Sequence, residues 1–138
     1  MMKKVWLLIG FMLLLVACGG QPSSNSAAPE IDVSSLGPSV DVDVAAAVRE
    51  HPDVFMLDVR EQFEYDAGHI PDITLIPMSE IQARLSELPT DKEIIVTCRS
   101  GNRSGQVTEY LRQQGFTNVH NMEGGIVAWE DAGYEVTR

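Results

Sequence analysis

Residues 93–104 of the chain read E-I-I-V-T-C-R-S-G-N-R-S. The largely apolar run 93–97 predicts a short strand that is buried on both faces, as strands of parallel sheets are. A helical pattern of apolar residues occupies 104–114, and Gly115 follows it as a C-terminal stop. The six residues between, 98–103, therefore form a loop that joins the end of a buried strand to the start of a helix.

This loop has the features of a binding site for negative charge. Gly101 permits a tight turn. The successive backbone N–H groups of such a turn point inward, and the positive end of the following helix dipole faces the same point. Cys98 lies at the edge of the loop and Arg103 at its end, so we expect the thiolate of Cys98 to be favoured over the thiol. A thiolate present at neutral pH is a nucleophile.

The alternative for Cys98 is a buried structural cysteine, a common environment for free thiols. That alternative does not account for the four polar residues that follow it directly, which are Arg99, Ser100, Asn102 and Arg103.

Short elements with short links occupy the rest of the chain from residue 40 onward. We expect strands over 54–59, 73–76 and 118–121, and helices over 44–50, 61–67, 79–88 and 125–132. Asp43 is the expected cap of the first helix, and Ser79 with Gln82 forms a capping box for the third. Strands that alternate with helices predict an α/β fold, with a parallel sheet covered by helices on both faces and ligands bound beyond the carboxyl ends of its strands.

Composition excludes several classes of protein. The 138 residues are 44% hydrophobic and 22% charged, which is typical of one globular domain. A formal charge of −10 argues against nucleic-acid binding and against electrostatic adhesion to an anionic membrane. Two cysteines are too few for a disulfide scaffold or a four-thiolate zinc site. His51 and His120 lie far apart with no ligand spacing, so we expect no metal, and we expect no other cofactor. His69 is interpreted as a hydrogen-bonded turn histidine, with a base near the site as the alternative.

The first 18 residues indicate an export signal. Lys3 and Lys4 precede an uncharged apolar run over 5–17 that ends L-V-A-C. This ending resembles the bacterial lipobox, which implies cleavage before Cys18 and lipid attachment to its sulfur; a plain secretory peptide is the alternative. We expect a signal peptide over 1–17 and a flexible lipid-anchored tether over 18–39, with packing of residues 31–36 on the domain left open. The domain, 40–138, would then be extracytoplasmic and held at a membrane.

Three ordered motifs carry a family resemblance. The loop C-R-S-G-N-R-S (98–104) is preceded by L-D-V-R-E-Q-F-E-Y-D-A-G-H-I-P (57–71) and followed by M-E-G-G-I-V-A-W-E-D-A-G-Y-E-V (122–136). Together they resemble the single-domain, rhodanese-like sulfurtransferases. The resemblance implies a five-stranded parallel sheet with helices on both faces and a Cys98 that cycles between thiolate and persulfide. Asp72 stands where the family usually has glycine, so we expect a local change in that turn.

The resemblance also implies roles for the loop residues. The backbone amides from Arg99 to Arg103 would cradle the terminal persulfide sulfur, and Arg99 would meet an anionic donor at the mouth. Arg103 would close the loop by binding backbone carbonyls or the substrate anion. The expected binding set is Arg99, Ser100, Gly101, Asn102 and Ser104. Asp58 and Arg60 would be structural, with Arg60 paired to Glu64 and Asp58 bound to loop amides.

The expected reaction moves sulfane sulfur from thiosulfate or a similar small anion to cyanide or a thiol. A persulfide carrier or protein-docking module, with a protein thiol as partner, is the main alternative. A phosphatase or arsenate reductase is a third hypothesis. Related cysteine-dependent phosphatases have one more residue between cysteine and arginine, and the shorter spacing from Cys98 to Arg103 favours a single sulfur over a phosphate. Neither Asp58 nor Asp72 is placed by the sequence as the general acid that a phosphatase needs.

Overall fold

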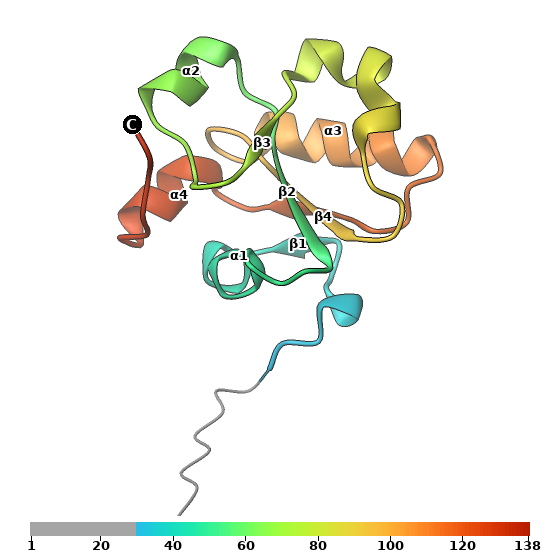
Figure 1. The fold of residues 1–138 in the computed structure, drawn as a ribbon, viewed down its shortest axis with the longest axis horizontal. Coiled ribbons are helices and arrows are strands. Elements are labelled where there is room, and N and C mark those ends of the chain that lie inside the picture. The colour runs from blue at the N-terminus through green and yellow to red at the C-terminus, as the bar shows by residue number, and fades with distance from the viewer. Residues whose placement is uncertain (1–29) are drawn as a thin grey trace, which may run out of the picture.

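The computed structural model describes residues 30–138, in which five parallel strands form one sheet in the order β1-β5-β4-β2-β3 (Figure 1). The strands are β1 (Ser39–Val40), β2 (Val54–Asp58), β3 (Thr74–Leu75), β4 (Glu93–Thr97) and β5 (Val119–Met122). The helices are α1 (Val42–Val48), α2 (Gln62–Ala67), α3 (Asn102–Gln113) and α4 (Gly125–Asp131), with the 3-10 helices η1 (Val33–Ser35) and η2 (Met78–Glu87). The expected five-stranded parallel sheet is confirmed.

Helices cover both faces of the sheet. Side chains alternate between the faces along each strand, so the apolar strands present buried side chains to both sides. Ile95 of β4 packs in one apolar cluster with Val48 of α1 and Trp129 of α4. Its neighbours Ile94 and Val96 point to the opposite face and pack in a second cluster with residues of α3 and η2. In Figure 1, α1 and α4 accordingly lie on one side of the sheet and α3 on the other. The strand β4 is thus buried on both faces, as its apolar run predicts.

The sheet order brings together two loops that are far apart in sequence. Strands β2 and β4 are neighbours, with Asp58 opposite Thr97 at their carboxyl ends. From β2 the chain continues toward β3 at one edge of the sheet, whereas from β4 it continues toward β5 on the other side. The loops after β2 and β4 therefore diverge around a shared crevice, which is where open α/β sheets bind ligands.

The first helix begins earlier than its sequence pattern predicts. Helix α1 starts at Val42, because the side chain of Asp41, and not that of Asp43, accepts the hydrogen bond from the Val44 amide at 2.8 Å. The chain can turn into the helix at this point because Asp41 itself keeps an extended backbone.

The segment expected as a capped α-helix over 79–88 is instead the 3-10 helix η2, so the expected capping box of Ser79 and Gln82 is wrong. Pro77 precedes the helix, and its carbonyl accepts a hydrogen bond from the Glu80 amide at 2.8 Å, the three-residue spacing of a 3-10 turn. No side chain caps this helix. Further on, Arg84 has a non-helical backbone that kinks it.

The N-terminal part of the described chain belongs to the domain. Val33 is buried in the cluster around α1, and Ile31 and Leu36 pack against that cluster. Residues 31–36 therefore take the packed alternative, and the flexible tether expected up to residue 39 is wrong for this part. Strand β1 follows and pairs with β5 through Ser39 and Val40. The expected signal peptide, Cys18 and the tether up to residue 29 lie outside the described residues.

Two local findings complete the fold. Asp72 has a φ of +61°, so this aspartate adopts a left-handed backbone that glycine prefers and that aspartate tolerates better than most residues. In the part of the chain from residue 30 onward, no helix has the length and apolar character needed to cross a membrane.

Candidate active site

Cys98 leaves the carboxyl end of β4 and is 1% exposed. Its Sγ accepts a hydrogen bond from the Gly101 amide at 3.1 Å and lies 3.4 Å from the Ser104 hydroxyl, which donates to it. Gly101 has a φ of +95°, a conformation that turns its N–H back toward the sulfur and that side chains disfavour. Helix α3 then begins at Asn102, two residues before the expected start at Ser104.

Two opposing effects set the pKa of Cys98. Burial raises it, because a thiolate loses hydration in a closed site. The Ser104 hydroxyl and the amides of Ser104, Ser100 and Gly101 donate hydrogen bonds to the sulfur and lower it. The hydrogen bonds prevail, so the pKa of Cys98 lies below that of an ordinary thiol. The loop therefore stabilises negative charge on sulfur with the Ser104 hydroxyl and with three main-chain amides, and the amides are the donors its sequence predicts.

The other expected binding residues divide into amide donors and exposed side chains. Ser100 and Gly101 face the sulfur with their amides, and Ser104 with both its amide and its hydroxyl. The side chains of Arg99, Ser100 and Asn102 belong to exposed residues.

The N-terminal end of α4 holds the loop by hydrogen bonds to its main-chain carbonyls, a role that sequence reasoning missed. The amides of Ile126 and Val127 donate to the carbonyls of Cys98 and Arg99 at 2.9 and 3.1 Å. A Cβ atom at Gly125 would lie 2.5 Å from the carbonyl oxygens of the same two loop residues. The glycine pair 124–125 was expected only as a tight turn. Its second glycine in fact lets the main chain of the Cys98 loop pack directly against the start of α4.

Arg103 is held by a carboxylate that sequence reasoning did not assign to it. Both of its terminal nitrogens donate to Glu64 of α2 at 2.7 Å, so the pair is bidentate. The hydrogen bonds from Arg103 lower the pKa of Glu64 to about 2. In the described part of the chain the side-chain hydrogen bonds of Arg103 go to Glu64 and not to loop carbonyls, so Arg103 ties α3 to α2. The expected contact of Arg103 with a substrate anion stays a prediction.

Asp58 and Arg60 form a buried pair at the carboxyl end of β2. The guanidinium of Arg60 donates to both oxygens of Asp58 at 2.7 to 3.0 Å, and the two side chains are 5% and 1% exposed. Arg60 also donates to the carbonyls of Glu64 and Gly68. The expected contacts are thus present in part: Asp58 accepts from a nearby loop amide, that of Arg60, and Arg60 binds Glu64 through its main-chain carbonyl. The direct pair between Asp58 and Arg60 was not expected.

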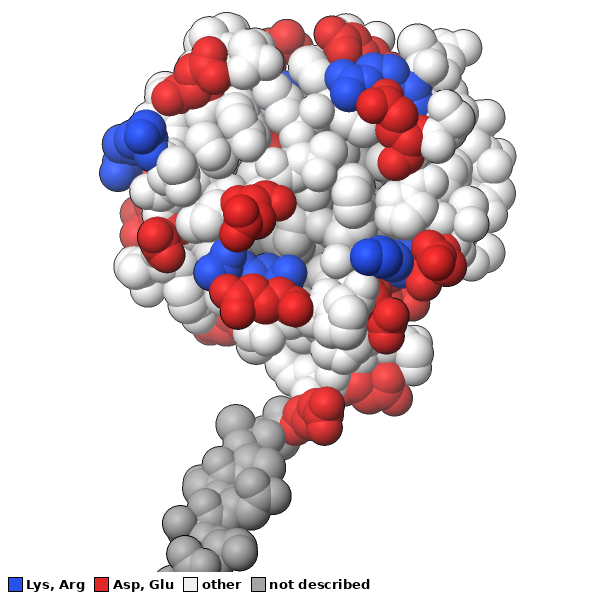
Figure 2. All heavy atoms as spheres, viewed as in Figure 1, with Lys and Arg blue, Asp and Glu red and all other residues white. Residues whose placement is uncertain are grey.

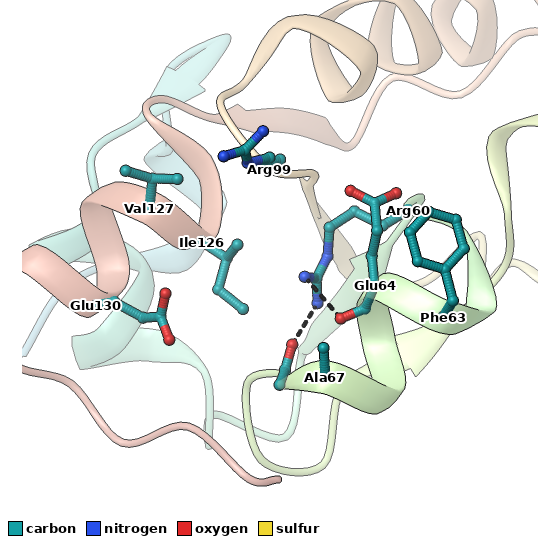
Figure 3. Close-up of a pocket in the computed structure, with 9 residues that line it drawn as sticks. Arg60, Phe63, Glu64, Ala67, Arg99, Ile126, Val127 and Glu130 are labelled. Carbon is teal, nitrogen blue, oxygen red and sulfur yellow. Dashed lines mark hydrogen bonds between the residues drawn. The ribbon is translucent and has the colours of Figure 1, made fainter.

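A pocket of about 540 Å³ opens between α2 and α4, beside the loop (Figure 3). Arg99 lines it next to Cys98 in the chain, and Arg60 and Glu64 line it from the β2 side. Apolar side chains complete it, namely Phe63, Ala67, Ile126 and Val127. Arg60 and Arg103 are engaged by Asp58 and Glu64, whereas Arg99 has no ion-pair partner within residues 30–138. Arg99 is therefore the cation available to an anionic group here.

The histidines have structural contacts. His69 stacks on Tyr65 with ring centroids 3.8 Å apart, and its Nδ1 lies 2.9 Å from the Tyr65 carbonyl oxygen. His120 lies between Glu93 and the Gly37 carbonyl. Over the described part of the chain, no three His, Cys, Asp or Glu side chains gather in a way that could hold a metal ion.

Known proteins resemble this chain both in sequence and in fold. Residues 41–132 match the rhodanese-like domain. A sulfurtransferase of Allochromatium vinosum is 44% identical over 107 residues, covering 78% of this chain and 92% of that protein. The thiosulfate sulfurtransferase GlpE of Pseudoalteromonas translucida is 39% identical over 80 residues, covering 58% of this chain and 76% of that protein. The crystal structure of a rhodanese-related protein from Thermoplasma volcanium superposes with a TM-score of 0.68 at 36% identity, covering 73% of this chain and 98% of that one.

The sheet order, the cysteine in a ring of amide donors after β4, and these relatives agree with one another. The chain belongs to the family of rhodanese-like domains, and the relatives it matches include sulfurtransferases.

Proposed function

We propose that the protein transfers sulfane sulfur from thiosulfate, or a similar small anion, to cyanide or a thiol through a persulfide on Cys98. One observation carries the proposal: the Cys98 sulfur lies among the amide and hydroxyl donors of its own loop, which lower its pKa. A lowered pKa raises the share of thiolate at neutral pH, and the thiolate, not the thiol, attacks sulfur.

The first step forms a bond between Cys98 Sγ and the outer sulfur of thiosulfate. The S–S bond of thiosulfate breaks, and sulfite leaves with its electron pair. The loop amides then face the negative terminal sulfur of the persulfide, which removes the need for any metal or organic cofactor in charge stabilisation. In the second step cyanide attacks that sulfur, thiocyanate leaves, and the electron pair returns to Cys98. Arg99 attracts the anions, and Arg103 keeps the loop in place through Glu64.

The two cysteines of the chain offer a matched test. We expect thiosulfate to add the mass of one sulfur atom to the Cys98 peptide in wild-type protein and in Cys18→Ser, and thiocyanate production to proceed in both. Cys98→Ser should neither gain sulfur nor make thiocyanate above background. Turnover by Cys98→Ser at the wild-type rate would overturn the proposal.

A persulfide carrier is the second candidate. It is favoured by the exposed apolar side chains beside Arg99, which a small anion does not require. A carrier loads one sulfur on Cys98 and discharges it to cyanide slowly, whereas an enzyme for small substrates turns over many times.

We also propose that residues 1–17 are removed as a signal peptide and that acyl chains on Cys18 hold the domain outside the cytoplasm at a bacterial membrane. The lipobox-like ending at Cys18 supports this, and several acyl chains give stable anchoring where one does not. Radiolabelled palmitate should be incorporated into wild-type protein in a bacterial host and be absent from Cys18→Ser. Equal labelling of both would contradict the anchor.

A further inference from the structure

Helix α2 forms one wall of the recess beside the Cys98 loop, yet the core does little to fix its position. Within the described chain none of its six residues is buried, and only Tyr65 packs against an apolar cluster. Helix α4, the opposite wall, is seated by the buried Ile126 and Trp129. A segment with few buried contacts opens at a low free-energy cost. The position of α2 therefore depends on the polar contacts at its ends.

Residues 134–138, the strap, hold the C-terminal end of α2. After α4 the chain turns at Gly133 and runs back, and its C-terminal end lies beside α2 and α4 in Figure 1. The His69 amide donates to the Thr137 carbonyl at 2.9 Å, and the Thr137 amide donates to the His69 carbonyl at 2.8 Å. Because His69 lies two residues beyond the last residue of α2, this two-way bridge anchors the helix where it ends.

Side chains of the strap add to this bridge. Val136 packs against the cluster around α1, and a Cβ atom at Gly68 would lie 3.1 Å from its Cγ1 atom. Arg138 donates to Glu130 of α4 at 2.8 Å. This pair places a cation beside two helices that contain acidic residues and no basic ones, on a molecule whose face in Figure 2 shows more widespread acidic than basic groups. Both partners of the pair are exposed, so the Thr137 bridge and the Val136 contact contribute most of the hold.

The position of α2 bears on what can reach Cys98. This residue is 1% exposed, and its neighbour Arg99 lines the recess between α2 and α4. A reagent broader than that recess reaches the sulfur only when α2 moves away from α4. Such a movement breaks the bridge between Thr137 and His69, because the strap is joined to α4 and seated on the core.

We propose that the strap determines specificity: by fixing α2 beside α4 it restricts Cys98 to slender sulfur groups, such as the outer sulfur of thiosulfate. Residues 134–138 lie beyond residues 41–132, which match the rhodanese-like domain, so the family match does not include the strap. The choice of sulfur groups as substrates rests on the proposed function, whereas the control of access to Cys98 does not.

The test compares how fast a small and a bulky reagent modify Cys98 in the full chain. Cys18→Ser protein is the background, so that Cys98 is the one thiol of the chain. Iodoacetamide is the small reagent, and a maleimide joined to fluorescein is the bulky one. Thr137→Pro removes the amide that donates to His69, and Thr137→Ala, which keeps the main-chain bonds, is its matched control. We expect the bulky-to-small rate ratio to rise about fivefold in Thr137→Pro, the factor expected for one main-chain hydrogen bond, and to stay unchanged in Thr137→Ala.

A second variant reaches the strap through a side chain. Val136→Ser keeps every main-chain donor and loses the apolar contact with Gly68, so the ratio should rise here too. In both variants the pH midpoint of iodoacetamide alkylation should stay at the wild-type value, because the strap contributes no donor to the Cys98 sulfur. A general loss of structure would move that midpoint. Deuterium uptake by the α2 peptide should be faster in both variants than in wild type.

Sulfur donors extend the test to the proposed function. Benzenethiosulfonate, a bulky donor, should gain on thiosulfate in loading Cys98 of Thr137→Pro, by a factor similar to that of the maleimide. A bulky-to-small alkylation ratio at the wild-type value in every folded strap variant would overturn the inference; if Thr137→Pro does not fold, Val136→Ser alone decides. Failure of wild-type protein to load sulfur from either donor would overturn the proposed function and leave the alkylation result on the strap intact.

Discussion

At Cys98 a buried position and a low pKa occur together, although burial alone raises the pKa of a thiol. The donors that reverse this effect are local. Gly101 and Ser104 lie three and six residues after the cysteine, so a single turn followed by one helical turn supplies them. The placement of these donors therefore depends on backbone conformation, which Gly101 makes accessible through its positive φ.

Removal of the Ser104 hydroxyl tests this account. Ser104 is fully buried, and its hydroxyl is the strongest of the contacts that lower the pKa of Cys98. In Ser104→Ala we expect that pKa to rise and the rate of alkylation at pH 7 to fall roughly tenfold, since a hydrogen bond to a charged group contributes about 1.5 kcal/mol. Alkylation by iodoacetamide across pH measures both. Thr108→Val, which removes a buried hydroxyl that bonds the Ser104 carbonyl and not the sulfur, is the control. An unchanged alkylation midpoint in Ser104→Ala would contradict the assignment.

At the scale of elements, α2 and α3 are tied across the crevice by Glu64 and Arg103. Glu64 also completes the capping box of α2, because its side chain accepts from the Glu61 amide at 3.1 Å. One carboxylate therefore fixes the start of α2 and the first turn of α3. The loop around Cys98 lies between β4 and that first turn, so this tie limits its movement.

The ion pair has a pH dependence of definite sign. The pKa of Glu64 falls from 4.5 to about 2 on folding, first through its hydrogen bonds to Arg103. A group whose pKa is lowered in the folded state stabilises that state fully above pH 4.5 and loses the contribution as the pH falls toward 2. We expect Glu64→Gln, which keeps an acceptor for the capping box, to reduce the free energy of unfolding by ~1 kcal/mol at pH 7, since the pair is partly exposed. Urea titrations at pH 7 and pH 3 should show that the difference in free energy of unfolding between wild type and Glu64→Gln is smaller at pH 3.

A surface carboxylate gives the control for this prediction. Glu80 pairs with Arg84 on η2, outside the pocket lining. Glu80→Gln should leave the rate at which thiosulfate loads Cys98 unchanged, whereas Glu64→Gln should slow it several-fold because Arg103 is released. A stability difference for Glu64→Gln that stays constant from pH 7 to pH 3 would show that the charge of Glu64 plays no part.

The sequence predicts those elements whose signals are local. The apolar run of β4, Gly101 of the loop and the helical pattern of α3 are each contained in a few adjacent residues, and the structure has all three, with α3 beginning two residues early. Ion-pair partners that are distant in sequence cannot be predicted from such local patterns. Glu64 and Arg103 are 39 residues apart, and several carboxylates compete for each arginine in a chain this acidic. Strand β1 is only two residues long, too short for any periodic pattern.

At the scale of the whole molecule, the segment before α1 completes the sheet. Val40 is 5% exposed in the cluster that also holds α1 and Trp129, and β1 adds an edge beside β5. Arg112 of α3 donates to the carbonyls of Pro38 and Val119, which joins this segment to the strand it pairs with. Residues 19–39 are rich in small and polar residues and lack a hydrophobic period, which predicts a tether. Single apolar residues, Ile31, Val33 and Leu36, are nevertheless enough to pack residues 31–36 against the domain.

The contribution of this segment to global stability follows from Val40. Val40→Ala removes two methyl groups' worth of buried surface and leaves a cavity beside α1, so we expect the free energy of unfolding to fall by about 2 kcal/mol. Ser39→Ala, at the exposed neighbouring position of the same strand, should change it by less than about 0.5 kcal/mol. Urea unfolding followed by circular dichroism gives both values. If the two substitutions had equal small effects, residues 39–40 would be an appendage to the sheet, and the domain would begin at α1. A loss confined to Val40→Ala, in one cooperative transition, includes β1 in the folding unit, which shortens any span left to link the domain to Cys18.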